Sequence, residues 1–413
     1  MQTKFLPRSA WPVLGVALVL GIAQVSVVAQ QPTAKSGASN AAPVLKFQAN
    51  TAALTTGEYW TADRMAAAKP LPLPRSAPGS VDLDPQVINR LAISKSESMK
   101  TGPGGLPTLR GLSTQAVPTE RFPLSTGDSL DNDSLDNESL SPESTPFSYA
   151  FPFNNFRTGI NNQYPYTTVG KLFFTIPAGA SEPAGDYVCS GSVTLNSHTV
   201  LTARHCMFDI ATGKWYGNWT FYPGWNNGSN AALGGGWKVN FAYTWVSNAP
   251  NWYWDIGFLS MHDSTGKGCG GDSGKVIGAY TGWLGYAYGG DYTQRQWNIF
   301  GYPQGKPFEG NYLYQDNGAT GQVNPLGTSG IVEIGNPQTG GTSGGPWILG
   351  FNPGNATDPS PSNNTFPTYF NLANGVNSFQ WTSPAEPLAI NGPEFNGDNF
   401  WNLYVAYSKI LCR

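Results

Sequence analysis

Short apolar runs interrupted by Gly, Asn and Pro dominate the chain from about residue 146 onward, and this pattern limits the folds open to it. Trp, Tyr and Phe are frequent there, whereas apolar spacing typical of long helices is missing until the last residues. Short runs bounded by turn residues are typical of β-strands. The sequence therefore predicts an all-β fold for residues 146–413.

The predicted strands fall into two groups of similar size, separated by a Gly-rich hinge at residues 266–274. The first group is 168–175, 187–195, 199–202, 219–222, 237–245 and 256–261; the second is 275–280, 297–302, 330–334, 346–349 and 369–376. A chain of 413 residues is long enough for more than one hydrophobic core. We therefore expect two β units, at residues 146–265 and 266–413.

The end of the chain has a different pattern. Apolar and aromatic residues recur at helical spacing after the possible caps Asp398 and Asn399. These residues are Phe400, Leu403, Tyr404, Tyr407, Ile410 and Leu411. We expect a single terminal helix packed on the second unit.

Residues 30–145 are poor in aromatics and rich in Ala, Ser and Pro, with a Pro-rich piece at residues 70–75. A short acidic repeat also occurs, at residues 129–133 and 134–138. Such composition buries little apolar surface and tends to stay flexible. We interpret residues 30–145 as a propeptide and linker, largely flexible.

The first residues carry an export signal. Lys4 and Arg8 precede an apolar run at residues 11–28, and small residues lead up to Ala29. This order is typical of a secretory signal peptide, here residues 1–29, cleaved after Ala29. The alternative is a membrane anchor, because the apolar run approaches the length of a bilayer span. Gln24 and Ser26 inside the run favour removal, so the mature protein is expected to be secreted and extracellular.

Composition also limits the partners. Charged residues make up 12% of the chain and the formal net charge is −3, so no basic surface is available to neutralise phosphates. We therefore expect no nucleic-acid partner. No other stretch of the sequence is long and apolar enough to span a bilayer, so we also expect no membrane partner after signal removal.

Four cysteines in an exported chain favour two disulfides, and four cysteines allow three pairings. No Cys-x-x-Cys pair occurs and the chain has three histidines, so the usual ligand spacing of structural zinc is missing. No metal site is predicted.

Three segments carry the chemistry: Thr-Ala-Arg-His-Cys ending at Cys206, Asp-Ile-Gly-Phe-Leu starting at Asp255, and Gly-Gly-Thr-Ser-Gly-Gly-Pro ending at Pro346. In this order they resemble the His, Asp and Ser blocks of the chymotrypsin-like serine peptidases. The resemblance covers roughly residues 165–410 and implies two consecutive antiparallel six-stranded β-barrels. It further implies a serine endopeptidase with a His-Asp-Ser triad.

The resemblance assigns Ser343 as nucleophile, His205 as general base and Asp255 as the residue that orients it. A serine hydroxyl is a weak nucleophile until a neutral imidazole takes its proton, and a buried carboxylate fixes the tautomer of that imidazole. The backbone N–H groups of Gly341 and Ser343 are implied as the oxyanion hole. This mechanism requires no cofactor.

The resemblance also implies a disulfide between Cys189 and Cys206, which leaves Cys269 for Cys412. It implies that Asn377, Ser378 and Phe379 lie along a bound peptide.

Ser273 is a rival nucleophile, because Gly-Asp-Ser-Gly at residues 271–274 looks like the core of many family members. It follows Asp255 too soon to leave room for strands of a second barrel, which favours Ser343. His262 and Asp263 form a weaker rival pair that we interpret as a polar strand end. His198 is interpreted as a turn residue.

The precursor layout and two further segments, at residues 221–228 and 374–378, look most like the glutamyl endopeptidase-like branch. Members that prefer Glu place a histidine in the pocket wall, where this chain has Asn377 and its neighbours. A trypsin-like preference for basic residues requires an acid six residues before the nucleophile. This chain has Pro337 there, although Glu333 is nearby. Neither specificity is predicted.

A different class of function is suggested by the tryptophans clustered between Trp215 and Trp254. Aromatic faces could make a secreted carbohydrate- or wall-binding β module, whereas large rings more often fill a core. An inactive relative is a further alternative. Retention of His, Asp and Ser in order favours an endopeptidase, expected to be a monomer acting on protein or peptide substrates.

Overall fold

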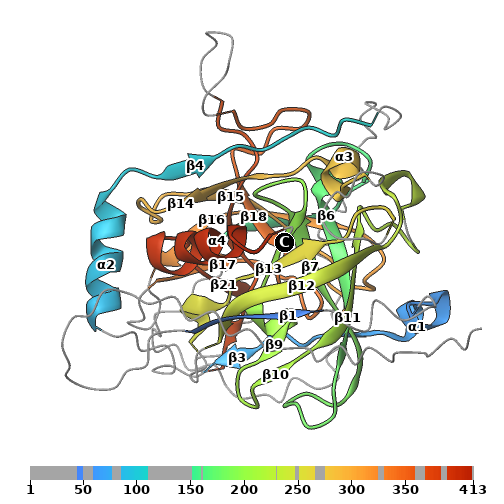
Figure 1. Cartoon of the computed structure of the whole chain (residues 1–413). Helices are drawn as coiled ribbons and strands as arrows, with labels where there is room; N and C mark the ends of the chain where they lie inside the picture. Colours follow the sequence, from blue (N-terminus) through green and yellow to red (C-terminus); the bar gives the residue numbers. More distant parts are fainter. Residues whose placement is uncertain are drawn as a thin grey trace, which may run out of the picture. The chain divides into compact units, whose positions relative to one another are not determined.

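Six antiparallel strands in the first half of the described chain close into a barrel, called the first barrel below (Figure 1). The strands are β6 Val169–Ile176, β7 Gly185–Val193, β8 Thr199–Thr202, β11 Gly217–Pro223, β12 Trp237–Val246 and β13 Gly257–Met261. Their pairing order is β12–β11–β6–β7–β8–β13, and β13 returns to β12. Closure leaves no unpaired barrel edge.

This computed structural model describes residues 44–49, 59–76, 85–109, 151–159, 161–228, 230–246, 251–265, 275–323, 330–358, 368–382 and 388–411. All of them belong to one compact unit, residues 40–413. The expected signal peptide, the hinge at 266–274, Ser273, Cys269 and Cys412 lie outside the described residues.

The second group of strands forms a sheet in the order β21–β17–β16–β15–β18–β19–β14–β4, called the second sheet below. Its strands are β4 Lys100–Gly102, β14 Gly285–Tyr288, β15 Gln296–Gly301, β16 Tyr314–Val323, β17 Ile331–Gly335, β18 Pro346–Leu349, β19 Leu372–Val376 and β21 Ala389–Pro393. In addition, β5 Phe153–Arg157 pairs with β16.

The expectation of a second closed six-stranded barrel is therefore corrected for the described residues. After β19 the chain forms one isolated β-bridge with β21, between Phe379 and Asn391, beside single hydrogen bonds such as that from the Ser378 N–H to the Asn391 carbonyl. No continuous ladder of described residues closes this sheet. The far edge is instead extended by β4, which comes from the N-terminal part of the chain and pairs with β14.

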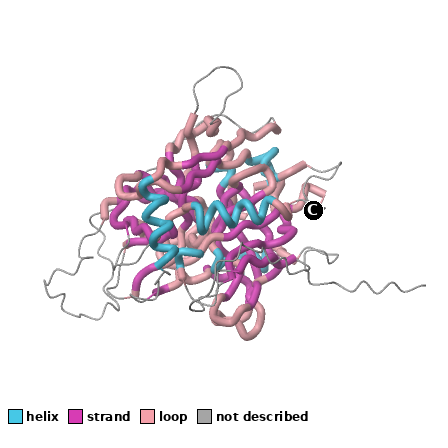
Figure 2. The backbone as a smooth tube through the Cα atoms, turned by 60° about the vertical axis from the view of Figure 1, so that its left-hand side comes forward, coloured by secondary structure: helices cyan, strands magenta, loops and turns pink. Residues whose placement is uncertain are grey.

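The described helices are short, and strands and loops make up most of the tube in Figure 2. They are α1 Ala62–Ala67, α2 Pro85–Ser96, α3 Ile277–Thr281 and α4 Asn402–Ser408. Single helical turns occur at Tyr166–Thr168, Arg204–Cys206, Ala231–Leu233, Trp252–Trp254 and Gly397–Trp401. The strand predicted at 275–280 is wrong, because α3 occupies that stretch.

The predicted terminal helix is confirmed by α4, but its packing differs from the expectation. Tyr407 lies against Phe241 and Phe258 of the first barrel, with ring centroids 5.8 and 5.3 Å away. Tyr404 lies against Tyr286 of the second sheet at 5.6 Å. Two neighbouring aromatic side chains of α4 thus contact the first barrel and the second sheet.

Parts of residues 30–145 form strands and helices, and some of these strands pair with the first barrel and the second sheet. The strand β1 Val44–Ala49 pairs with β12, and the two-residue strand β2 Lys69–Pro70 pairs with β7. The strand β3 Arg75–Ser76 pairs with β20 Gln380–Trp381, and Figure 1 shows α2 and β4 running alongside the second sheet.

The core is rich in large aromatic rings. Of the tryptophans between 215 and 254, Trp215 is half-buried and the others are buried: Trp219, Trp225, Trp237, Trp245, Trp252 and Trp254. Rings packed inside the molecule cannot present a flat face to a sugar. This burial removes the feature that suggested a carbohydrate-binding module.

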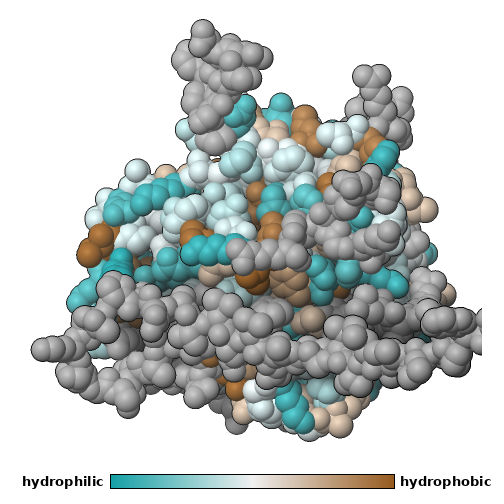
Figure 3. All heavy atoms as spheres, in the orientation of Figure 1, coloured by the Kyte–Doolittle hydropathy of each residue, from teal (hydrophilic) through white to brown (hydrophobic). Residues whose placement is uncertain are grey.

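The surface shown in Figure 3 is mostly hydrophilic where residues are described, with apolar residues scattered among polar ones. Among the described residues, no helix has the length and apolar character needed to cross a membrane.

Candidate active site

His205 lies in the helical turn Arg204–Cys206 that directly follows β8. The disulfide between Cys189 and Cys206 ties this turn to β7, as the resemblance implied. His205 is 8% exposed. A covalent link at the adjacent residue and a strand just before it restrict where the imidazole can point.

Asp255 ends the turn Trp252–Trp254 and precedes β13, and it holds His205 at two points. The Asp255 Oδ2 atom is 2.8 Å from His205 Nδ1, and Asp255 Oδ1 accepts a hydrogen bond from the His205 backbone N–H at 2.9 Å. With the carboxylate ionised, Nδ1 carries the hydrogen and Nε2 is left as the basic nitrogen.

Asp255 is fully buried, yet its carboxyl is held in the charged form. Burial acts to raise its pKa, but His205, Arg204 and the hydroxyl of Ser378 outweigh burial, so the pKa lies below its ordinary value. Ser378 Oγ donates a hydrogen bond to Asp255 Oδ2. Sequence analysis named Ser378 only for peptide binding and missed this contact.

Arg204 is a second residue that sequence analysis did not single out. Its guanidinium is fully buried and donates from Nη2 to the carbonyl of Asn251 at 2.8 Å. Burial lowers its pKa to about 10, and the charge of Asp255 opposes that shift. The group remains a cation at neutral pH. The one signal in the sequence for this role was the position of an arginine directly before His205.

Ser343 lies in the loop between β17 and β18, in a backbone path that needs glycine. Gly341 and Gly344 have φ angles of +95° and +79°, a region that side chains with Cβ rarely adopt. A Cβ on Gly344 would also lie 2.1 Å from Thr202 Oγ1. The loop can therefore approach the first barrel closely.

Ser190, which follows Cys189 on β7, connects this loop to the corner that carries His205. Its N–H donates to the carbonyl of Ser343 at 2.7 Å, and its hydroxyl donates to the carbonyl of Gly341 at 2.9 Å. Cys206 Sγ lies 3.7 Å from the same Ser343 carbonyl oxygen. Cys189 and Ser190 of β7 thus link the turn of the predicted base to the loop of the predicted nucleophile.

The two atoms expected to exchange a proton are both buried. Among the described residues, neither His205 Nε2 nor Ser343 Oγ has a hydrogen-bond partner. No hydrogen bond within the described residues occupies these two atoms, so both are available for chemistry.

The residues predicted along a bound peptide are buried, and their side chains contact the protein itself. Asn377 accepts a hydrogen bond from Trp347 Nε1 at 2.8 Å and donates to Thr342 Oγ1 at 2.8 Å. The ring of Phe379 stacks on that of Trp252 at 5.1 Å. What this segment can offer a peptide is therefore backbone, in particular the N–H of Gln380, a residue that sequence analysis did not name.

Of the rival residues, Ser273 lies outside the described part of the chain. His262 and Asp263 follow the end of β13 opposite to Asp255, where Asp263 Oδ1 accepts from the Thr265 hydroxyl at 2.6 Å. His198 lies in the turn between β7 and β8, and its N–H donates to Asn196 Oδ1 at 2.8 Å, which confirms the turn prediction.

The remaining specificity and metal candidates are also placed. Glu333 is buried within β17, in register with Asn391 of β21, and Pro337 follows β17 in the chain. Cys189, His205 and Cys206 cluster within 4.8 Å of one another. The two sulfurs form the disulfide, however, so they offer no thiolate to a metal.

Searches against known proteins gave matches among solved structures alone: no family model matches the chain, and no curated protein matches it. The thermostable serine protease AL20 from an extremophilic microorganism is 26% identical, with a TM-score of 0.46, over 59% of this chain and 98% of its own. The protease Anisep from Arthrobacter nicotinovorans is 25% identical, with a TM-score of 0.44, over 59% and 97%.

A Glu endopeptidase is 16% identical, with a TM-score of 0.44, over 62% of this chain and 96% of its own. Each of these structures matches this chain over nearly its own full length, at low sequence identity.

Proposed function

We propose that this chain is a secreted serine endopeptidase that hydrolyses peptide bonds through an acyl-enzyme formed on Ser343. The observation that carries the proposal is the buried Asp255–His205 pair, in which the carboxylate engages both the ring and the backbone of the histidine. A third hydrogen bond, from the Ser378 hydroxyl, helps to keep that carboxylate ionised and oriented. A histidine held in this way has its Nε2 free to act as a base.

In the proposed reaction, His205 Nε2 takes the proton of Ser343 Oγ as that oxygen bonds to the carbonyl carbon of the substrate. The carbonyl oxygen becomes negative and is stabilised by the N–H groups of Gly341 and Ser343. The C–N bond then breaks, and the imidazolium returns the proton to the leaving amine. Water repeats the cycle on the ester, with His205 taking its proton and Ser343 recovering its own.

Asp255 does not take the proton in this scheme. Its charge stabilises the imidazolium that forms at each transfer. Arg204 and the Ser378 hydroxyl help to keep Asp255 ionised in a buried position, which supports this role.

The processing and location of the protein belong to the same proposal. The signal-like first residues and the Cys189–Cys206 disulfide suit export to an oxidising compartment. We propose removal of residues 1–29 and a later cut within residues 30–145, giving a monomer active on proteins or peptides. Sequencing the N-terminus of the secreted protein tests this, and an end near residue 30 contradicts the second cut.

Labelling with a fluorophosphonate, which reacts with activated serine hydroxyls, tests the nucleophile. The secreted protein is expected to be modified at Ser343, and the modification should disappear in Ser343→Ala while persisting in the matched control Ser273→Ala. Peptide mapping by mass spectrometry locates the label. Labelling at Ser273, or none in a folded and processed sample, overturns the assignment and favours an inactive relative.

A further inference from the structure

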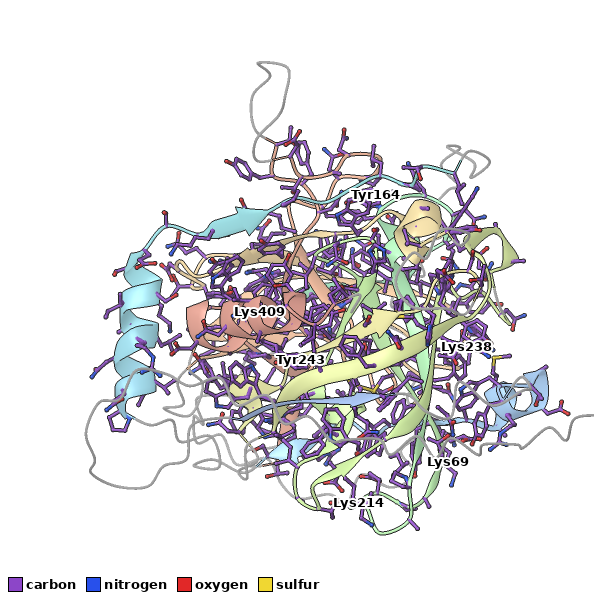
Figure 4. All side chains as sticks on the ribbon, viewed as in Figure 1. Lys69, Tyr164, Lys214, Lys238, Tyr243 and Lys409 are labelled. Carbon is purple, nitrogen blue, oxygen red and sulfur yellow. A yellow bond between two sulfur atoms is a disulfide. The ribbon has the colours of Figure 1, made fainter. Side chains whose placement is uncertain are left out.

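A Pro-rich segment of the N-terminal region lies across the candidate active site. Residues Lys69–Pro70 form β2 and pair in parallel with Tyr187–Val188 of β7, in the first barrel. A few residues later, Arg75–Ser76 form β3 and pair in parallel with Gln380–Trp381. Figure 4 labels Lys69, where this segment begins. The short stretch between β2 and β3 therefore runs from β7, which is linked to the turn of His205, to β20, which follows Ser378 in the chain.

Leu71 engages the oxyanion donor that the proposed mechanism requires. Its N–H donates to the carbonyl of Val188 at 3.1 Å, and its carbonyl accepts from the N–H of Gly341 at 3.0 Å. A Cβ on the neighbouring Gly340 would lie 2.8 Å from the same carbonyl oxygen, so the approach depends on a glycine there. A carbonyl of the chain itself thus occupies one of the two N–H donors proposed for the carbonyl oxygen of a substrate.

The other half of the segment occupies the backbone along which a peptide was expected. The N–H of Gln380 donates to the carbonyl of Pro74 at 2.9 Å, and the N–H of Thr382 donates to the carbonyl of Ser76 at 2.9 Å. These donors follow Ser378 and Phe379 directly in the chain. Main-chain bonds of this kind are how an extended peptide adds to the edge of a sheet.

The side chains of the segment alternate between the protein and the solvent. Leu71 and Leu73 are 3% and 8% exposed, whereas Pro72 between them is exposed. Leu71 belongs to a large apolar cluster with residues from both the first barrel and the second sheet, and Leu73 belongs to a smaller cluster that includes Ile390 of the second sheet. The two leucines therefore anchor the segment in two different apolar clusters.

The sequence of the segment suits a ligand that binds without being cut. Proline alternates with leucine from Pro70 to Pro74, which fixes φ at every second residue and lowers the entropy lost on binding. The peptide bond whose carbonyl meets Gly341 is Leu71–Pro72, so its nitrogen is a tertiary amide within a ring. The ring fixes the substituents on that nitrogen, which hinders the approach of its lone pair to the proton on His205.

Contacts on the N-terminal side fix the segment in place. Trp60 is buried and donates from Nε1 to the carbonyl of Asn218 at 2.7 Å, and Arg64 pairs with Asp186 at 3.0 Å. Gln304 Nε2 donates to the carbonyl of Ala68 at 2.7 Å, one residue before β2. The segment is thus held by the first barrel and by a loop of the second unit.

We infer that residues Lys69–Ser76 are a built-in inhibitor of the active site, which occupies the oxyanion donor of Gly341 and the peptide-binding backbone of Gln380 at once. This inference rests on the proposed function. It assigns the cleft a ligand of defined chemistry, an extended peptide of alternating proline and leucine, and assigns these residues the role of blocking the site until they are removed.

The test uses the full chain and compares its rate of fluorophosphonate labelling at Ser343 with that of a Leu71→Asp, Leu73→Asp double variant. Charges at two buried apolar positions should expel the segment, and labelling should become at least about tenfold faster. The matched control is the Lys69→Asp, Arg75→Asp double variant. It also introduces two aspartates, but at exposed positions of the segment, and labelling should stay slow. Equal rates in the wild-type chain and the double variant overturn the inference.

A capped peptide of residues Lys69–Ser76 then serves as an added ligand for the double variant. It should slow labelling again and remain intact by mass spectrometry, whereas a scrambled peptide of the same composition should not slow it. No effect of the peptide, or its cleavage after Leu71, contradicts the inference. If the double variant does not fold, the Leu71→Ala, Leu73→Ala variant should show a smaller acceleration in the same direction.

Amide hydrogen exchange separates this inference from the proposed function, because it needs no catalysis. The Gly341 N–H should exchange slowly in the full chain and faster in the double variant. If labelling is slow in every protein and Gly341 still exchanges in this pattern, the peptidase proposal is refuted. The contact between residues 69–76 and Gly341 is then still supported. Equal exchange of Gly341 in both proteins overturns the built-in inhibitor.

Discussion

His205 and Asp255 show how single residues acquire a role from their surroundings. An aspartate before an apolar run is unremarkable in sequence, and here it is fully buried against a histidine, an arginine and a serine hydroxyl. Burial alone would favour the neutral acid. The neighbouring positive charge and hydrogen bonds reverse that preference, and the ionised carboxylate fixes the tautomer of His205.

The substitution Asp255→Asn tests this arrangement. It keeps the shape of the side chain but removes the charge and allows the amide to donate to the ring, so the wrong imidazole nitrogen carries the hydrogen. Under the proposed mechanism we expect kcat to fall by roughly 10⁴-fold, the loss typical of Ser-His-Asp triads, with a small change in Tm. The control Asp263→Asn alters the aspartate near the opposite end of β13 and should leave kcat within about twofold. A loss shared by both variants argues against the role of Asp255.

At the scale of elements, neighbouring strands and helices decide what a local pattern becomes. Residues 275–280 have the composition of a strand, yet α3 forms there, followed by Gly282 with a φ angle of +69°. The strand β16 contains Asp316, which is fully buried between β5 and β15. An acid inside a sheet gives no apolar signal, and this strand was missed.

The buried acid of β16 gives the protein a pH dependence that can be measured. Burial raises the pKa of Asp316 from 3.8 to about 8, and the side-chain amide of the facing residue Asn155 opposes the shift. The folded state therefore keeps a proton that the unfolded chain releases. The resulting stabilisation is complete below about pH 4 and is lost as the pH rises toward 8.

We expect the contribution of Asp316 to the free energy of unfolding, measured in urea, to fall by about 1.4 kcal/mol per pH unit between pH 5 and 7. Asp316→Asn cannot ionise, so this part of the slope should disappear and the variant should be more stable than wild type at pH 9. The exposed Asp291, whose pKa is lowered by hydrogen bonds to Thr293, supplies the control Asp291→Asn. Parallel pH profiles for wild type and Asp316→Asn would contradict the prediction.

At the scale of the molecule, segments distant in sequence complete each other. The N-terminal strands β1 and β4 extend the first barrel and the second sheet, and α4 packs on both units. Lys95 of α2 pairs with the buried Glu394 at 2.9 Å. The disulfide and Ser190 join β7 to the loops of His205 and Ser343.

Removing the disulfide tests how far the site depends on this link. The Cys189→Ala, Cys206→Ala variant should lose about 3 kcal/mol of unfolding free energy, because the bridge closes a loop with a sequence separation of 17. Activity should fall further than stability explains, since the turn of His205 would no longer be tied to β7. Urea unfolding and kcat at a temperature where both proteins are folded measure the two effects. An unchanged urea midpoint would count against a structural role for the bridge.

The sequence by itself determined the β class, most strands of the first barrel and the terminal helix, because apolar spacing and turn residues act over short distances. The strands predicted at 168–175 and 199–202 match β6 and β8 within one residue at each end. It also singled out His205, Asp255 and Ser343 as a set, since each lies in a short distinctive segment.

Only the tertiary structure decided what these residues touch. The bond from Ser378 to Asp255, the buried Arg204, the open pairing of the second sheet and the contact between Leu71 and Gly341 all join positions far apart in the chain. Composition predicted flexibility for residues 30–145 as a whole, because a segment poor in apolar side chains forms no core of its own. The apolar contacts of Leu71 and Leu73 come from residues far along the chain, and such contacts leave no trace in local sequence.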